Sequence, residues 1–243
     1  MKKAFILIAV YTVLFAAKSQ AQDKKVALVS FYTVKQVGFV DKPSQQDILN
    51  SAKLADDTAW HILPILKSFR AQFFKNGVNK FPFQLLPERQ VLSNREYRQF
   101  IPDNGNVNDI LNFKTNLPVP GYQALPDQKK NENEKNMLAI FPDCDGIMKV
   151  VVKFELDRRG VGPKMALVKV KASATISLFN KKGEKVFETT ESALSQLSGS
   201  QIAGIPFMVP KKLLPLCENA ADELLIALQH DMPGIAEKAG SKL

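Results

Sequence analysis

Two segments in the second half of the chain alternate between apolar and polar residues. Residues 148–156 place an apolar side chain at every second position, and residues 168–178 repeat the pattern. Successive side chains of a strand point to opposite faces, so this period predicts two strands that each bury one face. Residues 157–164 supply a glycine-containing turn, which predicts an antiparallel pair with its other face in water. A third strand is expected at residues 184–189.

The first half of the chain predicts one strand followed by a helical region. Residues 26–34 read V-A-L-V-S-F-Y-T-V and are rich in the β-branched and aromatic residues typical of strands. From Ile48 onward, the apolar positions of residues 45–75 recur at helical spacing, so we expect one helix face to lie against the sheet. Pro64 cannot donate a backbone hydrogen bond, which predicts a kink or break near residues 61–63.

Shorter elements and a closing helix complete the predicted fold. Residues 81–86 predict a short strand, and residues 93–100 predict a short helix. Apolar residues spaced along residues 217–228 predict a helix that packs on the sheet, begins at Pro215 and ends near Pro233, with the residues after 235 frayed. The predicted fold class is therefore α/β (α+β), with a mixed, largely antiparallel sheet and helices packed on one face.

Residues 102–136 differ in character from the rest of the chain. Proline, glycine, asparagine, aspartate and lysine dominate this segment. We interpret it as a long polar surface insertion. Loops of this length inside a compact domain are uncommon and are usually functional or mobile. The insertion is therefore a candidate for family-specific function, and the alternative is an excursion without a role.

The amino-terminal residues have the pattern of a signal peptide. Lys2 and Lys3 precede an apolar run at residues 4–17, and small residues at Ser19 and Ala21 suit a signal peptidase. We therefore predict a signal peptide at residues 1–21 and a periplasmic or secreted protein, with an uncleaved anchor as the alternative. Residues 22–243 then suit a single α/β domain. No later run of about 18 apolar residues predicts a membrane span after cleavage.

The two cysteines leave their redox state open. Cys144 and Cys217 both belong to the predicted exported domain, where an oxidising compartment allows a disulfide between them. Cys217, however, lies on the apolar side of the predicted closing helix. Free cysteines at such positions often act as small hydrophobic residues.

Four lysines alternate with the apolar residues of the predicted strand pair. Lys149, Lys153, Lys169 and Lys171 lie on the predicted outer faces, in a chain of formal net charge +9. Together they predict a basic patch that attracts an anionic polymer or lipid headgroups. The alternative is that these lysines keep the sheet soluble and prevent edge pairing. Nucleic acid is disfavoured, because no aromatic residues lie among them as a single-strand binding surface requires.

No established catalytic or cofactor motif is present. The chain has two histidines, and its glycine-rich segments do not match a phosphate-binding loop. Asp57 and His61 share helical spacing but supply only two metal ligands. No cofactor or metal is expected. A hydrolase acting on a cell-envelope polymer remains the alternative function, with Asp143, Asp145 or Glu155 as general acid or base, provided that the carboxylates face one cleft.

Four segments resemble an envelope superfamily. They are V-A-L-V-S-F from residue 26, F-Q-L-L-P-E-R from residue 83, D-G-I-M-K-V-V-V from residue 145 and N-K-K-G-E-K-V-F from residue 180. The superfamily includes the curli secretion channel subunit and the lipoprotein activators of penicillin-binding proteins. The resemblance implies an α/β domain used for protein–protein contact or assembly, without chemistry of its own. It transfers no functional residue, and the export junction lacks the cysteine of lipoprotein members.

These observations predict an exported, non-enzymatic envelope protein that acts as an interaction or assembly domain. Its expected partner is an envelope protein of unknown identity. The predicted contact surface is the insertion or an exposed sheet edge, which would suit the addition of a partner strand.

Overall fold

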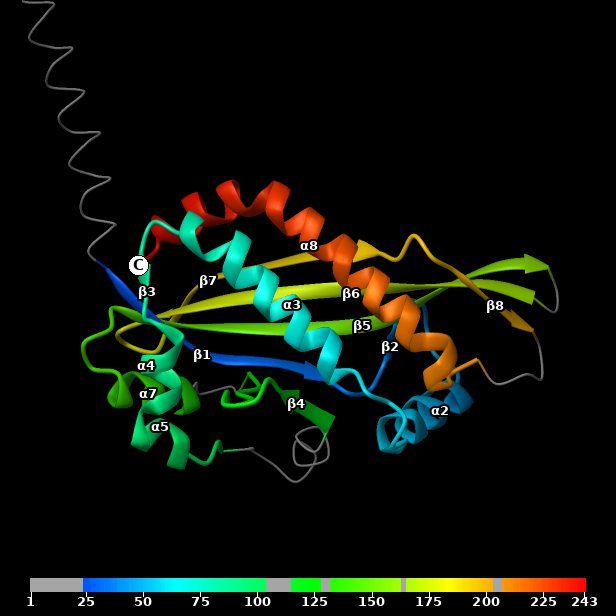
Figure 1. The fold of residues 1–243 in the computed structure, drawn as a ribbon, viewed down its shortest axis with the longest axis horizontal. Helices are drawn as coiled ribbons and strands as arrows, with labels where there is room; N and C mark the ends of the chain where they lie inside the picture. The colour runs from blue at the N-terminus through cyan, green and yellow to red at the C-terminus, as the bar shows by residue number, and fades with distance from the viewer. Residues whose placement is uncertain (1–23, 104–114, 128–131, 163–164, 203–206) are drawn as a thin grey trace, which may run out of the picture.

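The structure is a computed structural model that describes residues 24–103, 115–127, 132–162, 165–202 and 207–243. The predicted signal peptide lies outside these residues. Within them, eight strands form one mixed sheet (Figure 1). The strands are β1 (Lys25–Val34), β2 (Gly38–Phe39), β3 (Gln84–Leu85), β4 (Asn116–Pro118), β5 (Gly146–Gly162), β6 (Met165–Asn180), β7 (Lys185–Leu194) and β8 (Gly199–Ile202). The mixed α/β fold class is confirmed.

The sheet combines an antiparallel meander with a parallel edge. Its central order is β3-β1-β5-β6-β7, and β1 runs parallel to both β3 and β5. β5, β6 and β7 are antiparallel neighbours, which confirms the strand pair predicted from the alternating residues. The pairing of β5 with β6 continues to Gly162 and Met165, so both strands are longer than predicted. This end of the hairpin extends past the helices, and β8 pairs with β6 there (Figure 1).

The predicted helical region at residues 45–75 forms two helices. The helices of the structure are α2 (Gln45–Asp56), α3 (Leu63–Asn76), the 3-10 helix η1 (Val78–Lys80), α4 (Glu88–Ser93), α5 (Arg95–Gln99), α7 (Glu132–Ile140) and α8 (Pro210–Gly240). Pro64 lies in the first turn of α3. Backbone N–H groups in the first turn have no acceptor within the helix, so a proline there costs no helical hydrogen bond. The predicted break is therefore confirmed. Ser44 caps the other helix, α2, and forms a capping box with Asp47.

The closing helix is longer than the sequence predicted. The prediction that it begins at Pro215 and ends near Pro233 is wrong, because α8 runs through both prolines. Its buried stripe extends past them, with Leu213 fully buried on one side and Ala239 buried on the other. Packing against the sheet thus outweighs the helix-breaking tendency of proline, and the last residues do not fray.

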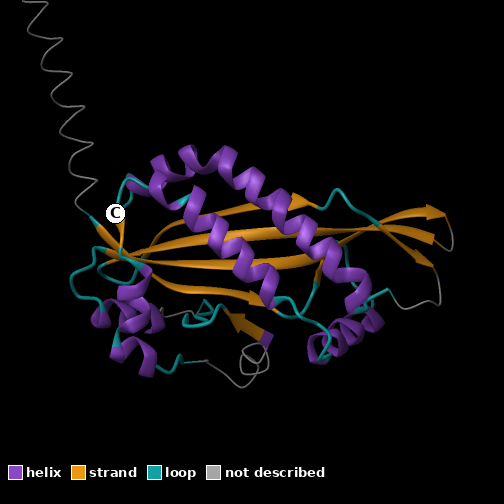
Figure 2. Ribbon diagram, viewed as in Figure 1, coloured by secondary structure: helices purple, strands orange, loops and turns teal. Residues whose placement is uncertain are grey.

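One face of the sheet carries the main hydrophobic core. α3 and α8 contact each other and cover this face (Figure 2). Phe31 of β1 contacts Phe69 and Phe73 of α3, with ring centroids 6.3 and 6.0 Å apart. The core positions of β5 and β6 are the apolar residues that alternate in the sequence: Met148, Val150, Val152, Phe154, Leu156, Val168, Val170, Ala172, Ala174, Ile176 and Leu178.

The opposite face of the sheet carries a second, smaller core at one end. Ala27, Ile147 and Phe179 point to this side and pack with Tyr97 of α5 and Met137 of α7. The prediction of helices on one face holds for the two long helices, but the short helices α4, α5 and α7 cover this end of the second face.

Part of the predicted polar insertion belongs to these packed layers. β4 pairs with the edge of β1, and both Tyr122 and Leu125 are buried. Ser30 of β1 donates a hydrogen bond to the carbonyl of Gln123 (2.8 Å). The prediction of a surface excursion is therefore wrong for residues 115–127 and for residues 132–136 of α7, where Asn133 and Glu134 are buried. Residues 104–114 and 128–131 lie outside the described residues.

Candidate functional site

The predicted basic patch does not include Lys149. This side chain is only 1% exposed, and its Nζ donates to Glu134 Oε1 (2.5 Å) and Asp127 Oδ1 (2.6 Å). Glu134 is fully buried and comes from α7. Lys149 was expected in water, but α7 folds over this part of the sheet and supplies the buried carboxylate that pairs with it.

The ion pair of Lys149 belongs to a larger charged network. Asp127 Oδ2 accepts a hydrogen bond from Lys185 Nζ (2.7 Å), and Lys185 also contacts Glu188 (2.7 Å). Partial burial opposes ionisation of Asp127, but the ammonium groups of Lys149 and Lys185 outweigh it and lower its pKa. We define the charged network as Lys149, Glu134, Asp127, Lys185 and Glu188. It joins α7 and the segment before it to β5 and β7.

The other three lysines of the predicted patch do not act as one group. Lys171 contacts Glu155 at 3.4 Å, so its charge is partly offset. Lys169 is half-buried on β6, opposite Asp157 of β5. Lys153 is exposed, and its ammonium group has no ion pair among the described residues. The four lysines therefore do not form a continuous patch, and of the four only Lys153 is exposed.

The two cysteines are free thiols on opposite faces of the sheet. Cys144 packs in the small core beside α7, whereas Cys217 lies under α8 in the main core. The disulfide that the sequence allowed is therefore not formed. Burial, together with Asp145 and Asp143, raises the pKa of Cys144 to about 11, and burial raises the pKa of Cys217 further. Neither thiol is a ready nucleophile at neutral pH.

The acidic residues of the hydrolase alternative do not share a cleft. Asp143 is exposed, and Asp145 accepts a hydrogen bond from the Lys25 amide (2.9 Å) and contacts Lys181 (3.1 Å). Partial burial opposes ionisation of Asp145, but the Lys25 amide and Lys181 outweigh it and lower its pKa. Glu155 lies nine positions beyond the start of β5, about 30 Å away along the strand. The three carboxylates therefore lack the common site that the hydrolase alternative requires.

Asp57 and His61 do not share a helix face. Both residues lie in the break between α2 and α3. In the described part of the chain, no three histidine, cysteine or acidic residues come together as a metal site.

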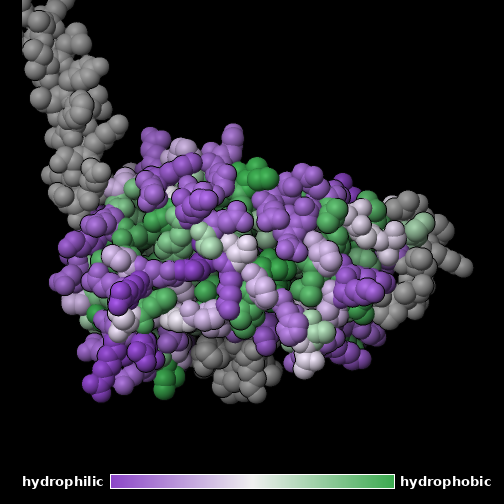
Figure 3. Space-filling view, viewed as in Figure 1, coloured by the Kyte–Doolittle hydropathy of each residue, from purple (hydrophilic) through white to green (hydrophobic). Residues whose placement is uncertain are grey.

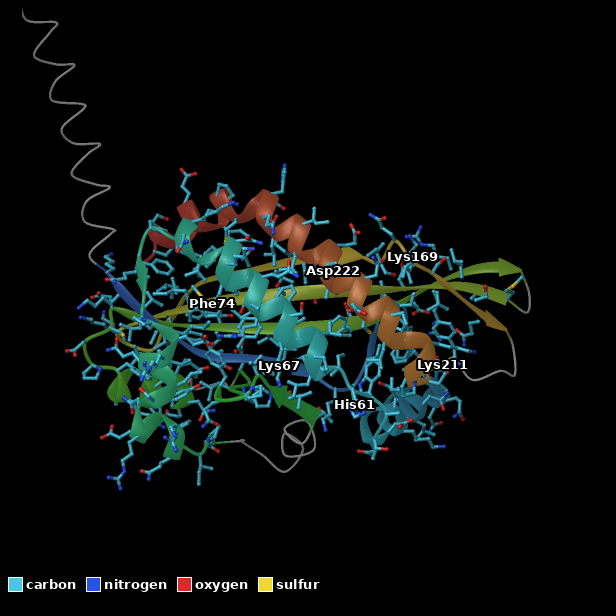
Figure 4. The ribbon with its side chains drawn as sticks, viewed as in Figure 1. His61, Lys67, Phe74, Lys169, Lys211 and Asp222 are labelled. Carbon is cyan, nitrogen blue, oxygen red and sulfur yellow. The ribbon has the colours of Figure 1, made fainter. Side chains whose placement is uncertain are left out.

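A groove of about 250 Å³ lies between α3 and α8. His61 and Ser68 line one side, and Glu218 and Asp222 line the other. Figure 4 labels His61 before α3 and Asp222 on α8. Its apolar floor includes Phe69, which is almost fully buried. Figure 3 shows apolar side chains on this face among a mostly hydrophilic surface. The groove thus combines an apolar floor with two carboxylates on its α8 side, and none of the described lysines or arginines lines it.

A second hollow, of about 330 Å³, lies at the end of β1, beside β2 and α2. β1 pairs with β5 as far as Val152, and β2 resumes the pairing at Glu155. Lys153 and Phe154, the two residues of β5 between these pairings, line the hollow where the parallel ladder is interrupted. The lining residues are Val34, Gln36, Val37, Gly38, Phe39, Ile48, Ser51, Lys153, Phe154 and Glu155.

Side-chain hydrogen bonds fix the chain around this hollow. Ser51 of α2 donates to the Val37 carbonyl (2.6 Å), and Trp60 donates to the Lys35 carbonyl (2.9 Å). These bonds satisfy backbone groups that the interrupted sheet leaves unpaired. The hollow is therefore formed by the fold itself.

Large apolar side chains are exposed at Ile48, which lines the hollow, and at two sequence neighbours of lining residues. Val40, Ile48 and Leu49 are 50%, 55% and 50% exposed, and we call them together with the hollow the α2–β2 surface. Ile48 was predicted to face the sheet, but it lies at the open rim because α2 covers the end of the sheet and not its centre. Helical spacing assigns Ile48 to the apolar face of its helix. It cannot show whether another element of the fold covers that part of the face.

β7 forms one edge of the sheet. In the described residues it pairs with β6 alone. Lys185, Glu188 and Glu191 interrupt this edge with charges, a common protection against unwanted strand pairing.

Comparisons with known proteins give no family. No family model and no curated protein matches the chain. A crystal structure of a neuraminyllactose-binding hemagglutinin homologue from Helicobacter pylori is similar with 5% identity and a TM-score of 0.35, covering 91% of this chain and 94% of that one. A hypothetical protein from Chlamydia trachomatis has 9% identity and a TM-score of 0.33, with 90% and 97% coverage.

A third solved structure, a minor lipoprotein from Acinetobacter baumannii, has 12% identity and a TM-score of 0.24, covering 45% of this chain and 86% of that one. The resemblance to the envelope superfamily remains a prediction from the sequence. Among the described residues, no helix is both long enough and apolar enough to cross a membrane.

Proposed function

We propose that this chain is an exported, non-enzymatic protein of the bacterial envelope that binds another envelope component through the α2–β2 surface. The observation that carries the proposal is a hollow formed by the fold itself, with Ile48 exposed in its lining and Val40 and Leu49 exposed next to lining residues in the sequence. Single exposed apolar residues are common on soluble proteins, but a group beside a hollow is typical of a binding site. Export rests on the signal-peptide pattern of residues 1–21.

The rigidity of the surface supports this proposal. Arg158 of β5 contacts Asp41 after β2 and Asp47 of α2, each at 2.9 Å. Its guanidinium group also lies over the Phe39 ring, 5.2 Å from the centroid. Arg158 thus ties β2 and α2 to the central sheet. A surface held in place before binding loses less conformational entropy when a partner arrives.

A photo-crosslinking residue at position 49 tests the proposal. Cells that produce the full chain with this substitution should yield a discrete adduct with an envelope component. The matched control is position 226, because Ile226 of α8 is 61% exposed but lies away from the hollow. Ile48→Asp should remove the adduct at position 49, since it places a charge on the apolar rim. Equal adducts at both positions, or none at position 49, would contradict the proposal.

Export is tested separately by cell fractionation. The full chain should leave the cytosol, and a variant with Ile6→Arg and Ile8→Arg should accumulate there, because both charges interrupt the apolar run of the signal peptide. Retention of both proteins in the cytosol would contradict the predicted localisation.

A further inference from the structure

We propose that the α2–β2 hollow binds a single-chain amphiphile with a carboxylate head, a fatty-acid anion. The inference rests on the α2–β2 surface of the proposed function and names the chemistry of what occupies it. It follows from three properties of the hollow: its apolar interior, its cationic rim and its size.

The interior of the hollow suits an alkyl chain. Val34, Val37, Phe39, Ile48 and Phe154 supply its apolar lining. Val37 and Phe154 belong to the main core, with 1% and 2% exposure, so they form a floor that cannot move aside easily. Burying an alkyl chain against this floor removes apolar surface from water, which favours binding by about 0.8 kcal/mol for each methylene group.

The rim of the hollow favours an anionic head. Lys153 is exposed at the opening, and its ammonium group has no ion pair among the described residues. The neighbouring carboxylate, Glu155, lies 3.4 Å from Lys171, so the rim keeps an excess positive charge. Gln36 also lines the hollow, and its side chain carries an amide donor. An apolar tail with one negative head complements this arrangement.

The size of the hollow suits an amphiphile with one alkyl chain. Its volume of about 330 Å³ is near the lower end of ligand pockets. A lipid with two acyl chains would leave most of its apolar surface in water. Ile48, which lines the hollow and is 55% exposed, extends the apolar surface outward, where the remainder of a single tail can lie.

Titration calorimetry of the purified full chain with dodecanoate tests the inference. Dodecanoate is used below its micelle concentration and should bind saturably with one site. Dodecyltrimethylammonium has the same tail with a cationic head, and butyrate has the same head with a short tail. Each should bind at least about tenfold more weakly, the effect of losing one charge-assisted contact or most of the apolar burial. Equal binding of the ammonium amphiphile would overturn the role of the rim charge.

Variants locate the binding site within the chain. Lys153→Gln should weaken dodecanoate binding about tenfold. Lys182→Gln is the matched control, because Lys182 lies in the exposed turn between β6 and β7 at the other end of the sheet. Val34→Trp should fill the hollow and abolish binding. If Val34→Trp does not fold, Ile48→Ala replaces it as the test. Ile48→Ala should weaken binding, because an exposed contact at the rim is lost. Unchanged affinity in Lys153→Gln and Ile48→Ala would overturn the proposed site.

The outcomes distinguish this inference from the proposed function. An adduct at position 49 without saturable dodecanoate binding would overturn the inference and leave the contact surface standing. Dodecanoate binding without that adduct would support the inference and contradict contact with a partner. N-acetylleucine offers a carboxylate with a short branched tail, and binding as tight as that of dodecanoate would show that the hollow takes a peptide end instead.

Discussion

The two faces of the central sheet are held to their helices by different physical means. On the face under α3 and α8, β6 presents Ala174, Ile176 and Leu178, and the contact is almost entirely apolar. On the opposite face the same strand presents Thr175 and Ser177, beside the charged network. The first face is stabilised by the burial of apolar surface, which does not depend on any one pair of side chains. The second depends on pairing between particular polar groups, so a change of one partner has a larger effect there.

The largest expected effect comes from the charged network. Lys149→Met should destabilise the protein by about 3–5 kcal/mol, because it leaves the fully buried Glu134 without its cation. The double variant Lys149→Met with Glu134→Leu should recover most of this loss, since two apolar side chains need no pairing. Urea unfolding measures both values. A single variant as stable as the original protein would show that the two faces do not differ as described.

The next effect probes the apolar face. Leu224 of α8 is fully buried in the main core, and Leu224→Ala should cost about 2–5 kcal/mol through the cavity it leaves. Ile226→Ala, two residues along the same helix, is the matched control and should change stability by less than about 0.5 kcal/mol. Thermal and urea unfolding check both variants. Similar losses in the two would mean that α8 does not present one face to the sheet.

Acid should weaken the polar face first. The pKa of Asp127 is lowered in the folded protein from its ordinary value of 3.8, so its charge stabilises the fold at pH values above 3.8, and this stabilisation is lost as the pH falls through the lowered pKa. The apolar face has no such dependence. The urea midpoint should therefore fall as the pH is lowered below about 4, and it should fall less in Asp127→Asn. An identical change in both proteins would exclude Asp127 as a source of acid sensitivity.

The smallest effect is expected at the exposed part of the polar face. Thr175 and Thr190 form a cross-strand hydroxyl pair with an oxygen–oxygen distance of 2.8 Å. Thr190→Ala should cost about 0.5–1 kcal/mol, because water can replace the lost partner. Ser192→Ala on the same strand is the comparison. A loss above about 2 kcal/mol at Thr190 would indicate that this region is less open to water than described.

Local patterns predicted the elements whose structure is decided locally. The period of residues 148–156 and 168–178 was sufficient because one face of each strand is buried along its length. Pro64 located the break between α2 and α3 for a local steric reason. Prolines 215 and 233 misled the prediction for α8, since distant packing overrides their cost.

The features that sequence reasoning missed depend on contacts between distant segments. Lys149 has the same spacing as the other outward lysines, and only the position of Glu134 on α7 explains its burial. The hollow arises from β1, β2, α2 and β5 together. Its one local signal was Ile48, an apolar residue near the start of a helix, and that signal does not distinguish a core position from an open rim.

The placement of the two cysteines has a practical consequence for labelling. Cys144 and Cys217 are the chain's only sulfhydryl groups, and each is shielded within its own layer. A cysteine introduced at an accessible site such as position 49 would be the single group that maleimide dyes modify in the native state. Fluorescent or spin probes can therefore be attached without first replacing the native residues, and reducing agents used during such work should leave the fold intact.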